Sequence, residues 1–268
     1  MNRVLDMANP INWLCPLNRG VIGWWMAPDG WQSGSRLPDL CNMNHGTLTS
    51  MTSVTDWRAS EYGPDLSFGS ARYVGTRFAR TLGDWTCATI FMPPAAGSAT
   101  YDTVIDKKYD TGFGLQNNGG TSWCVFSFAS FGAVNISLAN GAWHSWVACR
   151  EGGTLNSWGN GGDVSATGAV ASTALDSTTL SIGGRVSAGA GSNPFTGRVQ
   201  LVLMLDRAVS RDWASNFHDQ WKCGFPDMLN WVDFPSLYAP VAVGGVGGSL
   251  MRSKLLTNGL LIGGRLAT

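Results

Sequence analysis

The stretch FTGRVQLVLMLDRAVSRDWASNFHDQW, residues 195–221, changes its pattern in the middle and decides the fold class. Its apolar first half predicts a strand over 199–205. Its second half predicts a short helix over 210–221, with Ser210 as the N-cap residue. The apolar stripe of this helix consists of Trp213, Phe217 and Trp221.

Outward from this stretch, the chain predicts short strands joined by Gly-rich turns. Residues 21–26 (VIGWWM) form one, and 85–92 (WTCATIFM) is apolar at both alternating sets of positions, which predicts burial of both its faces. Asn160-Gly161 favours a type I′ hairpin. The expected sandwich core includes Trp143, Val147, Val199, Leu201 and Leu203. The sequence therefore predicts an all-β, antiparallel jelly-roll sandwich with one short C-terminal helix and extended terminal arms.

Composition supports this fold class. Among 268 residues only 13% are charged, while Gly (35) and Trp (13) are abundant, which disfavours both a disordered chain and a helical bundle. The net charge of zero predicts no nucleic-acid partner, and no apolar run is long enough for a membrane span. The first 20 residues lack the pattern of a signal peptide. The six isolated cysteines are expected to be free thiols in a reducing compartment.

Five segments in order resemble LamG-like jelly-roll domains of the concanavalin A-like lectin/glucanase superfamily. They are GVIGWWMAPDG (20–30), LPDLCNMNHGTLT (37–49), LSFGSARYV (66–74), AWHSWVACREGGTLNSWGNGG (142–162) and the stretch 195–221. The resemblance covers about residues 20–222 and implies a lectin-like sandwich. One departure is the hairpin turn, which is GNGG here where that family often has an Asp. Family members are commonly secreted, whereas this sequence shows no leader, so we expect a protein of a phage-like particle.

The expected organisation is an N-terminal arm (1–20), the sandwich (21–222) and a C-terminal extension (223–268). Residues 239–268 contain no acidic and no aromatic residue, and 254–262 predicts an apolar hairpin around Asn258-Gly259. Such a hairpin is marginal alone, so we expect it to order against its own sandwich, another copy or another virion protein. The expected assembly contacts are Arg252, Lys254, Leu255, Leu256, Leu260, Leu261, Ile262 and Arg265.

The titratable residues do not form a catalytic motif. His45 and His144 are expected to be structural and His218 to be solvated, because no spacing links them as metal ligands. The two glutamates, Glu61 and Glu151, are 90 residues apart and neither has an acid two residues away, and no G-x-S-x-G elbow occurs. We therefore expect no catalytic residues and no cofactor.

Two binding hypotheses remain open. Asp102, Asp106 and Asp110, with Asp163, are weak calcium candidates, and the alternative is that they are solvated loop acids. Aromatic side chains near expected loops are candidate platforms for glycans. These are Trp31, Trp57, Trp123 and Trp158.

The sequence favours a non-enzymatic structural or adhesion protein of a phage-like particle, as a capsid decoration or a tail- or fibre-associated protein. It would be made in the host cytoplasm, reside in the virion as an oligomer, and contact host surface glycans. A free carbohydrate-binding lectin module is one alternative, and a glycan hydrolase is the other.

Overall fold

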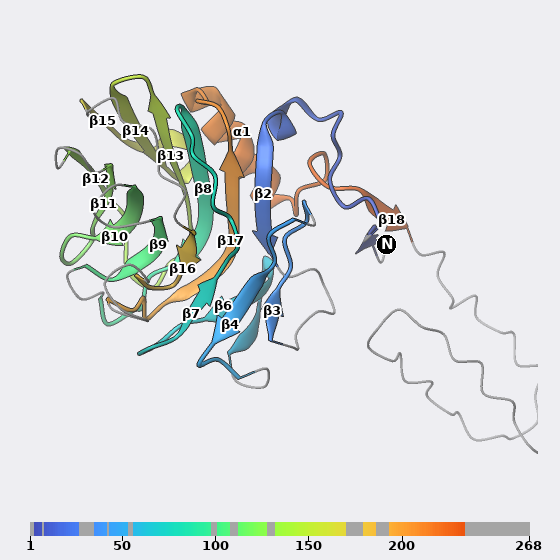
Figure 1. The fold of residues 1–268 in the computed structure, drawn as a ribbon, viewed down its shortest axis with the longest axis horizontal. Coiled ribbons are helices and arrows are strands. Elements are labelled where there is room, and N and C mark those ends of the chain that lie inside the picture. The colour runs from blue at the N-terminus through green and yellow to red at the C-terminus, as the bar shows by residue number, and fades with distance from the viewer. Residues whose placement is uncertain are drawn as a thin grey trace, which may run out of the picture.

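The computed structural model is a sandwich of two antiparallel sheets with one helix on its outer side (Figure 1). The structure describes residues 3–6, 8–26, 35–41, 43–52, 56–97, 101–107, 112–127, 132–169, 179–185 and 193–233. The expected all-β fold class is thereby confirmed. Within these ranges, no helix has the length and apolar character needed to cross a membrane.

The first sheet has eight strands. In order across the sheet they are β12 (Gly132–Ser137), β11 (Ser122–Ser127), β10 (Phe113–Asn117), β9 (Thr103–Lys107), β16 (Ser181–Ile182), β7 (Tyr73–Gly75), β4 (Gly46–Thr49) and β3 (Arg36–Leu37).

The second sheet also has eight strands. In order they are β15 (Val164–Ala169), β14 (Thr154–Gly159), β13 (His144–Glu151), β8 (Trp85–Met92), β17 (Arg198–Leu205), β6 (Gly63–Ser67) and β5 (Trp57–Ser60), with β2 (Val21–Met26) also paired to β17. Two 3-10 turns accompany the sheets, η1 (Pro16–Asn18) and η2 (Asn160–Gly162). Pairing of Gly159 with Val164 confirms the hairpin expected between β14 and β15, but the connection consists of residues 160–163 and contains η2 rather than a two-residue type I′ loop.

A two-stranded ribbon joins distant parts of the chain. It pairs β1 (Arg3–Leu5) with β18 (Trp231–Asp233), and an isolated bridge between Ile11 and Leu229 continues the association. In Figure 1 this ribbon lies beyond β2, to the right of the sandwich. Leu5 and Ile11 are buried, so parts of the expected N-terminal arm pack firmly against residues that follow the helix.

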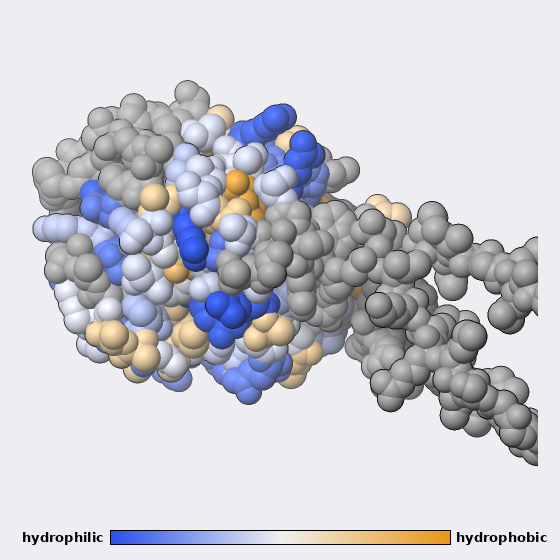
Figure 2. Space-filling view, turned by 90° about the horizontal axis from the view of Figure 1, so that it is seen from below, coloured by the Kyte–Doolittle hydropathy of each residue, from blue (hydrophilic) through white to orange (hydrophobic). Residues whose placement is uncertain are grey.

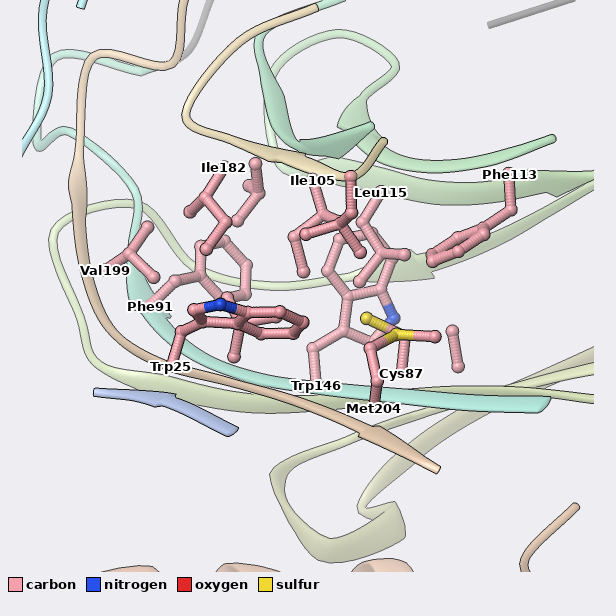
Figure 3. Packing of buried hydrophobic residues seen from close by; sticks show 14 of the residues in the cluster. Trp25, Cys87, Phe91, Ile105, Phe113, Leu115, Trp146, Ile182, Val199 and Met204 are labelled. Carbon is pink, nitrogen blue, oxygen red and sulfur yellow. The ribbon is translucent and has the colours of Figure 1, made fainter. Parts of the chain in front are cut away.

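The hydrophobic interior consists of two layers. Between the sheets, Trp25, Phe91 and Trp146 of the second sheet face Ile105 and Leu115 of the first (Figure 3). On its other face the second sheet packs against α1 (Arg211–Lys222). Because β8 lies in the middle of the second sheet, its alternating side chains enter both layers, and the predicted burial of both faces is confirmed.

Strand β17 contains an irregularity that the sequence analysis missed. The register with β8 shifts between Val199 and Leu201, so Gln200 lies in a bulge. Val199 therefore enters the inter-sheet layer, whereas Leu201 and Leu203 lie under α1. The predicted burial of these residues and of Val147 in β13 is confirmed, but Val147, Leu201 and Leu203 lie between the second sheet and α1 rather than between the two sheets. Trp143 is only partly buried.

The helix forms as the sequence predicts. The Ser210 hydroxyl accepts a hydrogen bond from the Trp213 amide at 3.3 Å, and the apolar stripe is buried against the second sheet.

Figure 2 shows one face of the molecule, where polar residues are interspersed with small apolar spots.

Candidate functional site

A cavity of about 380 Å³ lies where the C-terminal end of α1 meets the β5–β6 turn and the β1–β18 ribbon. Its volume falls within the range of about 300–1,000 Å³ that is typical of small-molecule sites. We call it the aromatic pocket. Its lining includes Glu61, Tyr62, Gln200, Trp221, Lys222 and Trp231.

The bulge in β17 fixes the floor of the aromatic pocket. The Trp221 indole Nε1 donates to Gln200 Oε1 at 2.9 Å, and the same amide donates from Nε2 to the Tyr62 carbonyl oxygen. Gln200 and Trp221 are buried, at 4% and 1% exposure, so these polar groups are satisfied inside the protein. The floor is therefore held in one arrangement before any ligand arrives.

The Lys222 ammonium group lies against two aromatic rings of the lining, Tyr62 and Trp221. The rings of Tyr62 and Trp221 have centroids 4.6 Å apart. The Lys222 ammonium lies 4.5 Å from the first centroid and 4.2 Å from the second, and it donates to the Tyr62 hydroxyl at 2.9 Å. Cation–π attraction and this hydrogen bond together hold the long lysine side chain at the wall.

Another part of the lining comes from the ribbon. Trp231 is partly buried, and its indole Nε1 donates to the Phe225 carbonyl oxygen at 3.2 Å, which orients the ring. Pairing of Leu5 with Trp231 fixes its backbone. Glu61 and Tyr62 form the two-residue turn between Ser60 and Gly63, and Glu61 is exposed. The aromatic pocket thus combines ring faces with a carboxylate and an ammonium group.

Three of the four predicted glycan platforms are buried rather than at the surface. Trp57, Trp123 and Trp158 lie in β5, β11 and β14, and they are only 6%, 0% and 8% exposed. We therefore correct the expectation that these indoles face solvent, because the strands direct them into the two hydrophobic layers. Trp31 lies outside the described residues, as do all the expected assembly contacts between 252 and 265.

Two histidines have the structural roles that the sequence predicts. His45 Nδ1 accepts a hydrogen bond from the Asp39 amide at 3.0 Å. His144 is buried, and its ring nitrogens lie 3.1 Å from Asn160 Oδ1 and 2.7 Å from the Ala139 carbonyl oxygen.

The other two expectations for titratable side chains are corrected. His218 is half-buried against β13 rather than solvated. Asp102 and Asp106 are buried, at 5% and 1% exposure, rather than solvated loop acids. Asp110 is outside the described residues, and within them no three His, Cys, Asp or Glu side chains gather as a metal site.

The sequence matches no protein-family model and no curated protein. Several solved structures resemble the fold. A mutant of Trypanosoma rangeli sialidase displaying trans-sialidase activity has 13% identity and a TM-score of 0.55, over 76% of this chain and 33% of that one. A structure on botulinum neurotoxin type C, whose cell entry depends upon interaction with two ganglioside molecules, has 11% identity and a TM-score of 0.58, over 78% and 53%.

Domain 4 of AbnA, a GH43 extracellular arabinanase from Geobacillus stearothermophilus, in complex with arabinotriose, has 12% identity and a TM-score of 0.55. That match covers 74% of this chain and 98% of the domain, whereas the chain spans about a third of the sialidase and half of the neurotoxin structure. At such identities the likeness shows the fold, a jelly-roll-like β-sandwich.

Proposed function

We propose that this protein is a carbohydrate-binding module that holds a saccharide in the aromatic pocket. The observation that carries the proposal is the convergence of Tyr62, Trp221 and Trp231 with Glu61 and Lys222 around one cavity. Sugar rings offer apolar C–H faces and a rim of hydroxyl groups, and the pocket supplies matching partners for both. The ganglioside and arabinotriose in the descriptions of two similar structures agree with this class of ligand.

Each wall has its own role. The Trp231 ring, oriented by Phe225, supplies the stacking surface. The Glu61 carboxylate accepts hydrogen bonds from sugar hydroxyls, and the Lys222 ammonium donates to sugar oxygens. Hydrogen bonds that involve a charged partner are roughly twice as strong as neutral ones, so these two groups dominate orientation of the ligand.

We propose binding without cleavage. Glycoside hydrolysis usually needs two carboxyl groups about 5–10 Å apart. Among the described residues that line the pocket, Glu61 is the single acid. One carboxylate beside an aromatic wall suits recognition of a saccharide.

The test is a glycan array followed by calorimetry on the best ligand. We expect Trp231→Ala to weaken affinity about 30-fold, as for other anchor aromatics. Glu61→Gln keeps size and removes charge at an exposed position, so it should weaken binding without affecting the fold. Mass spectrometry of the glycan after incubation should show it intact.

The matched control is Trp13→Ala, which removes an indole that is 55% exposed and does not line the pocket. It should bind like the parent protein. The pocket would be refuted as the binding site if Trp13→Ala lowered the affinity as much as Trp231→Ala. It would also be refuted if neither Glu61→Gln nor Trp231→Ala changed the affinity. Saccharide fragments that disappear in Glu61→Gln would instead support a hydrolase.

A finer proposal is that the module belongs to the LamG-like domains and is displayed on a phage-like particle. The support is the order of the resembling segments and the apolar, acid-free sequence of 239–268. On this proposal, the C-terminal extension (223–268) contacts other copies or other virion proteins, and the protein resides in the virion.

A further inference from the structure

A second, smaller cavity of about 90 Å³ lies at the edge of the first sheet. Its lining consists of Arg36, Met43, His45, Thr47 and Arg77. Arg36 and Thr47 are cross-strand partners in β3 and β4, so their places are set by sheet register.

The loop that carries this cavity is built around Asp39. The buried Asp39 carboxylate accepts hydrogen bonds from four backbone amides. They belong to Trp24, Cys41, Met43 and Asn44, at 2.9, 3.0, 3.4 and 2.9 Å. The Trp25 indole also donates to the Asn44 carbonyl oxygen at 2.7 Å. The wall formed by Met43 and His45 is therefore preorganised by a closed hydrogen-bond network.

The polar side chains that line this cavity are rich in donors. The two guanidinium groups carry only donors, and the Thr47 hydroxyl can donate. His45 Nδ1 accepts a hydrogen bond from the Asp39 amide, which holds the ring at the wall of the cavity. Arg36 and Arg77 are exposed, and within the described part of the chain neither forms an ion pair.

We infer that this cavity is an oxyanion site that binds the carboxylate or sulfate group of an acidic ligand. Arg36 and Arg77 both line this cavity, so an anion held there is attracted by two guanidinium groups. The volume is about three times the share of one liquid water molecule, so it accommodates a charged group but not a whole sugar. The inference is independent of the aromatic pocket, with which this cavity shares no lining residue.

Met43 indicates what the anion is attached to. Its side chain is 64% exposed and lines the same cavity, although large apolar side chains are otherwise mostly buried here. It offers an apolar contact to the organic part of a ligand outside the cavity. A carboxylated sugar such as a uronic acid, with its C–H face, fits this arrangement.

The test is an NMR titration of backbone amides with sodium sulfate and with glucuronic acid, at constant ionic strength set by sodium chloride. Both probes should give saturable shifts at Thr47 and His45. Arg36→Ala and Arg77→Ala should each weaken binding about tenfold. Met43→Ala should weaken glucuronate and leave sulfate unchanged.

Arg80→Ala is the matched control, because Arg80 is exposed and nearby in sequence but does not line the cavity. It should bind both probes normally, and so should Trp231→Ala. Equal weakening in Arg80→Ala would show diffuse attraction to positive charge, and the absence of saturable shifts with both probes would overturn the inference. Because Trp231→Ala reports on the aromatic pocket alone, failure of one site leaves the other unaffected.

Discussion

Ser145 Oγ and His218 Nδ1 lie 2.8 Å apart, and this hydrogen bond ties the middle of the second sheet to α1. Ser145 is buried, at 1% exposure, and the His218 ring lies edge-on to Trp221 with centroids 5.4 Å apart. Burial, and next the Lys222 ammonium, lower the pKa of His218 below its ordinary value of about 6.5. The neutral imidazole is thus part of the contact between helix and sheet.

Stability should therefore decrease in mild acid. The unfolded chain binds a proton at His218 more readily than the folded protein does, so the stabilisation is complete above pH 6.5 and is lost as pH falls through the folded pKa. Urea unfolding at intervals from pH 7.5 to 5 measures this slope. His218→Gln should flatten it, because the substitution removes the group whose pKa is lower in the folded protein than in the unfolded chain. An unchanged slope in the variant would show that a group other than His218 causes the pH dependence of stability.

Leu203→Ala should lower the free energy of unfolding by about 2–5 kcal/mol. Leu203 is fully buried in the layer under α1, and truncation leaves a cavity that the sheet cannot close. Urea denaturation gives the value. Leu14→Ala is the control, because Leu14 is 93% exposed and its truncation should change stability by no more than about 0.5 kcal/mol.

Asp39→Ala should destabilise the protein by about 2–4 kcal/mol, because it leaves several backbone donors of the loop without an acceptor. Asp39→Asn keeps one side-chain oxygen, which can still accept from the Trp24 and Cys41 amides that share Oδ1. This variant should therefore lose less stability than Asp39→Ala. Thermal unfolding of both variants gives the comparison. Equal losses would show that the carboxylate does not organise the loop.

Thiol reactivity should separate the six cysteines. Burial raises the pKa of the Cys124 thiol to about 11 and raises the pKa of the Cys87 and Cys149 thiols as well, whereas Cys223 is exposed. At pH 8 a thiol reagent should modify Cys223 first in the native protein and all six cysteines in denaturant. Cys223→Ser should remove the fast phase. A count of four or fewer in denaturant without reductant would indicate a disulfide.

Deletion of residues 244–268 should leave the sandwich folded by circular dichroism, because both sheets and α1 consist of residues that precede this segment. If the C-terminal extension is the assembly contact, the truncated protein should fail to self-associate or to enter a particle. Light scattering and particle incorporation measure this. Normal incorporation would contradict the proposed anchor.

Local sequence patterns predicted the elements whose causes are local. The sequence of β8 is a continuous apolar run, and α1 is indicated by its N-cap residue Ser210 and its apolar stripe. Both signals lie within short stretches of sequence, and both elements form as expected. The bulge at Gln200 gave no such signal, because it arises where β17 pairs with its neighbours. Because the bulge places one extra residue in β17, Leu201 and Leu203 lie on the face of the second sheet that packs against α1.

The aromatic pocket was missed for a related reason. Tyr62 lies in a two-residue turn and Trp231 in a short strand, far apart in the sequence, and the tertiary fold brings both to the lining of one cavity. Three of the four predicted platforms are buried because an indole near a turn signal can equally lie in a strand, as Trp57 does at the start of β5. Such contacts depend on tertiary pairing, which one sequence does not show.

The β1–β18 ribbon also determines how the molecule responds to mechanical load. Arg3 pairs with Asp233 at the open end of the ribbon, so tension between these ends acts on one residue pair at a time, as in unzipping. The third pair to separate is Leu5 and Trp231, which both line the aromatic pocket. Tension on this ribbon should therefore separate Leu5 from Trp231 while both eight-stranded sheets stay intact. If the aromatic pocket binds a saccharide as proposed, its affinity should decrease under tension.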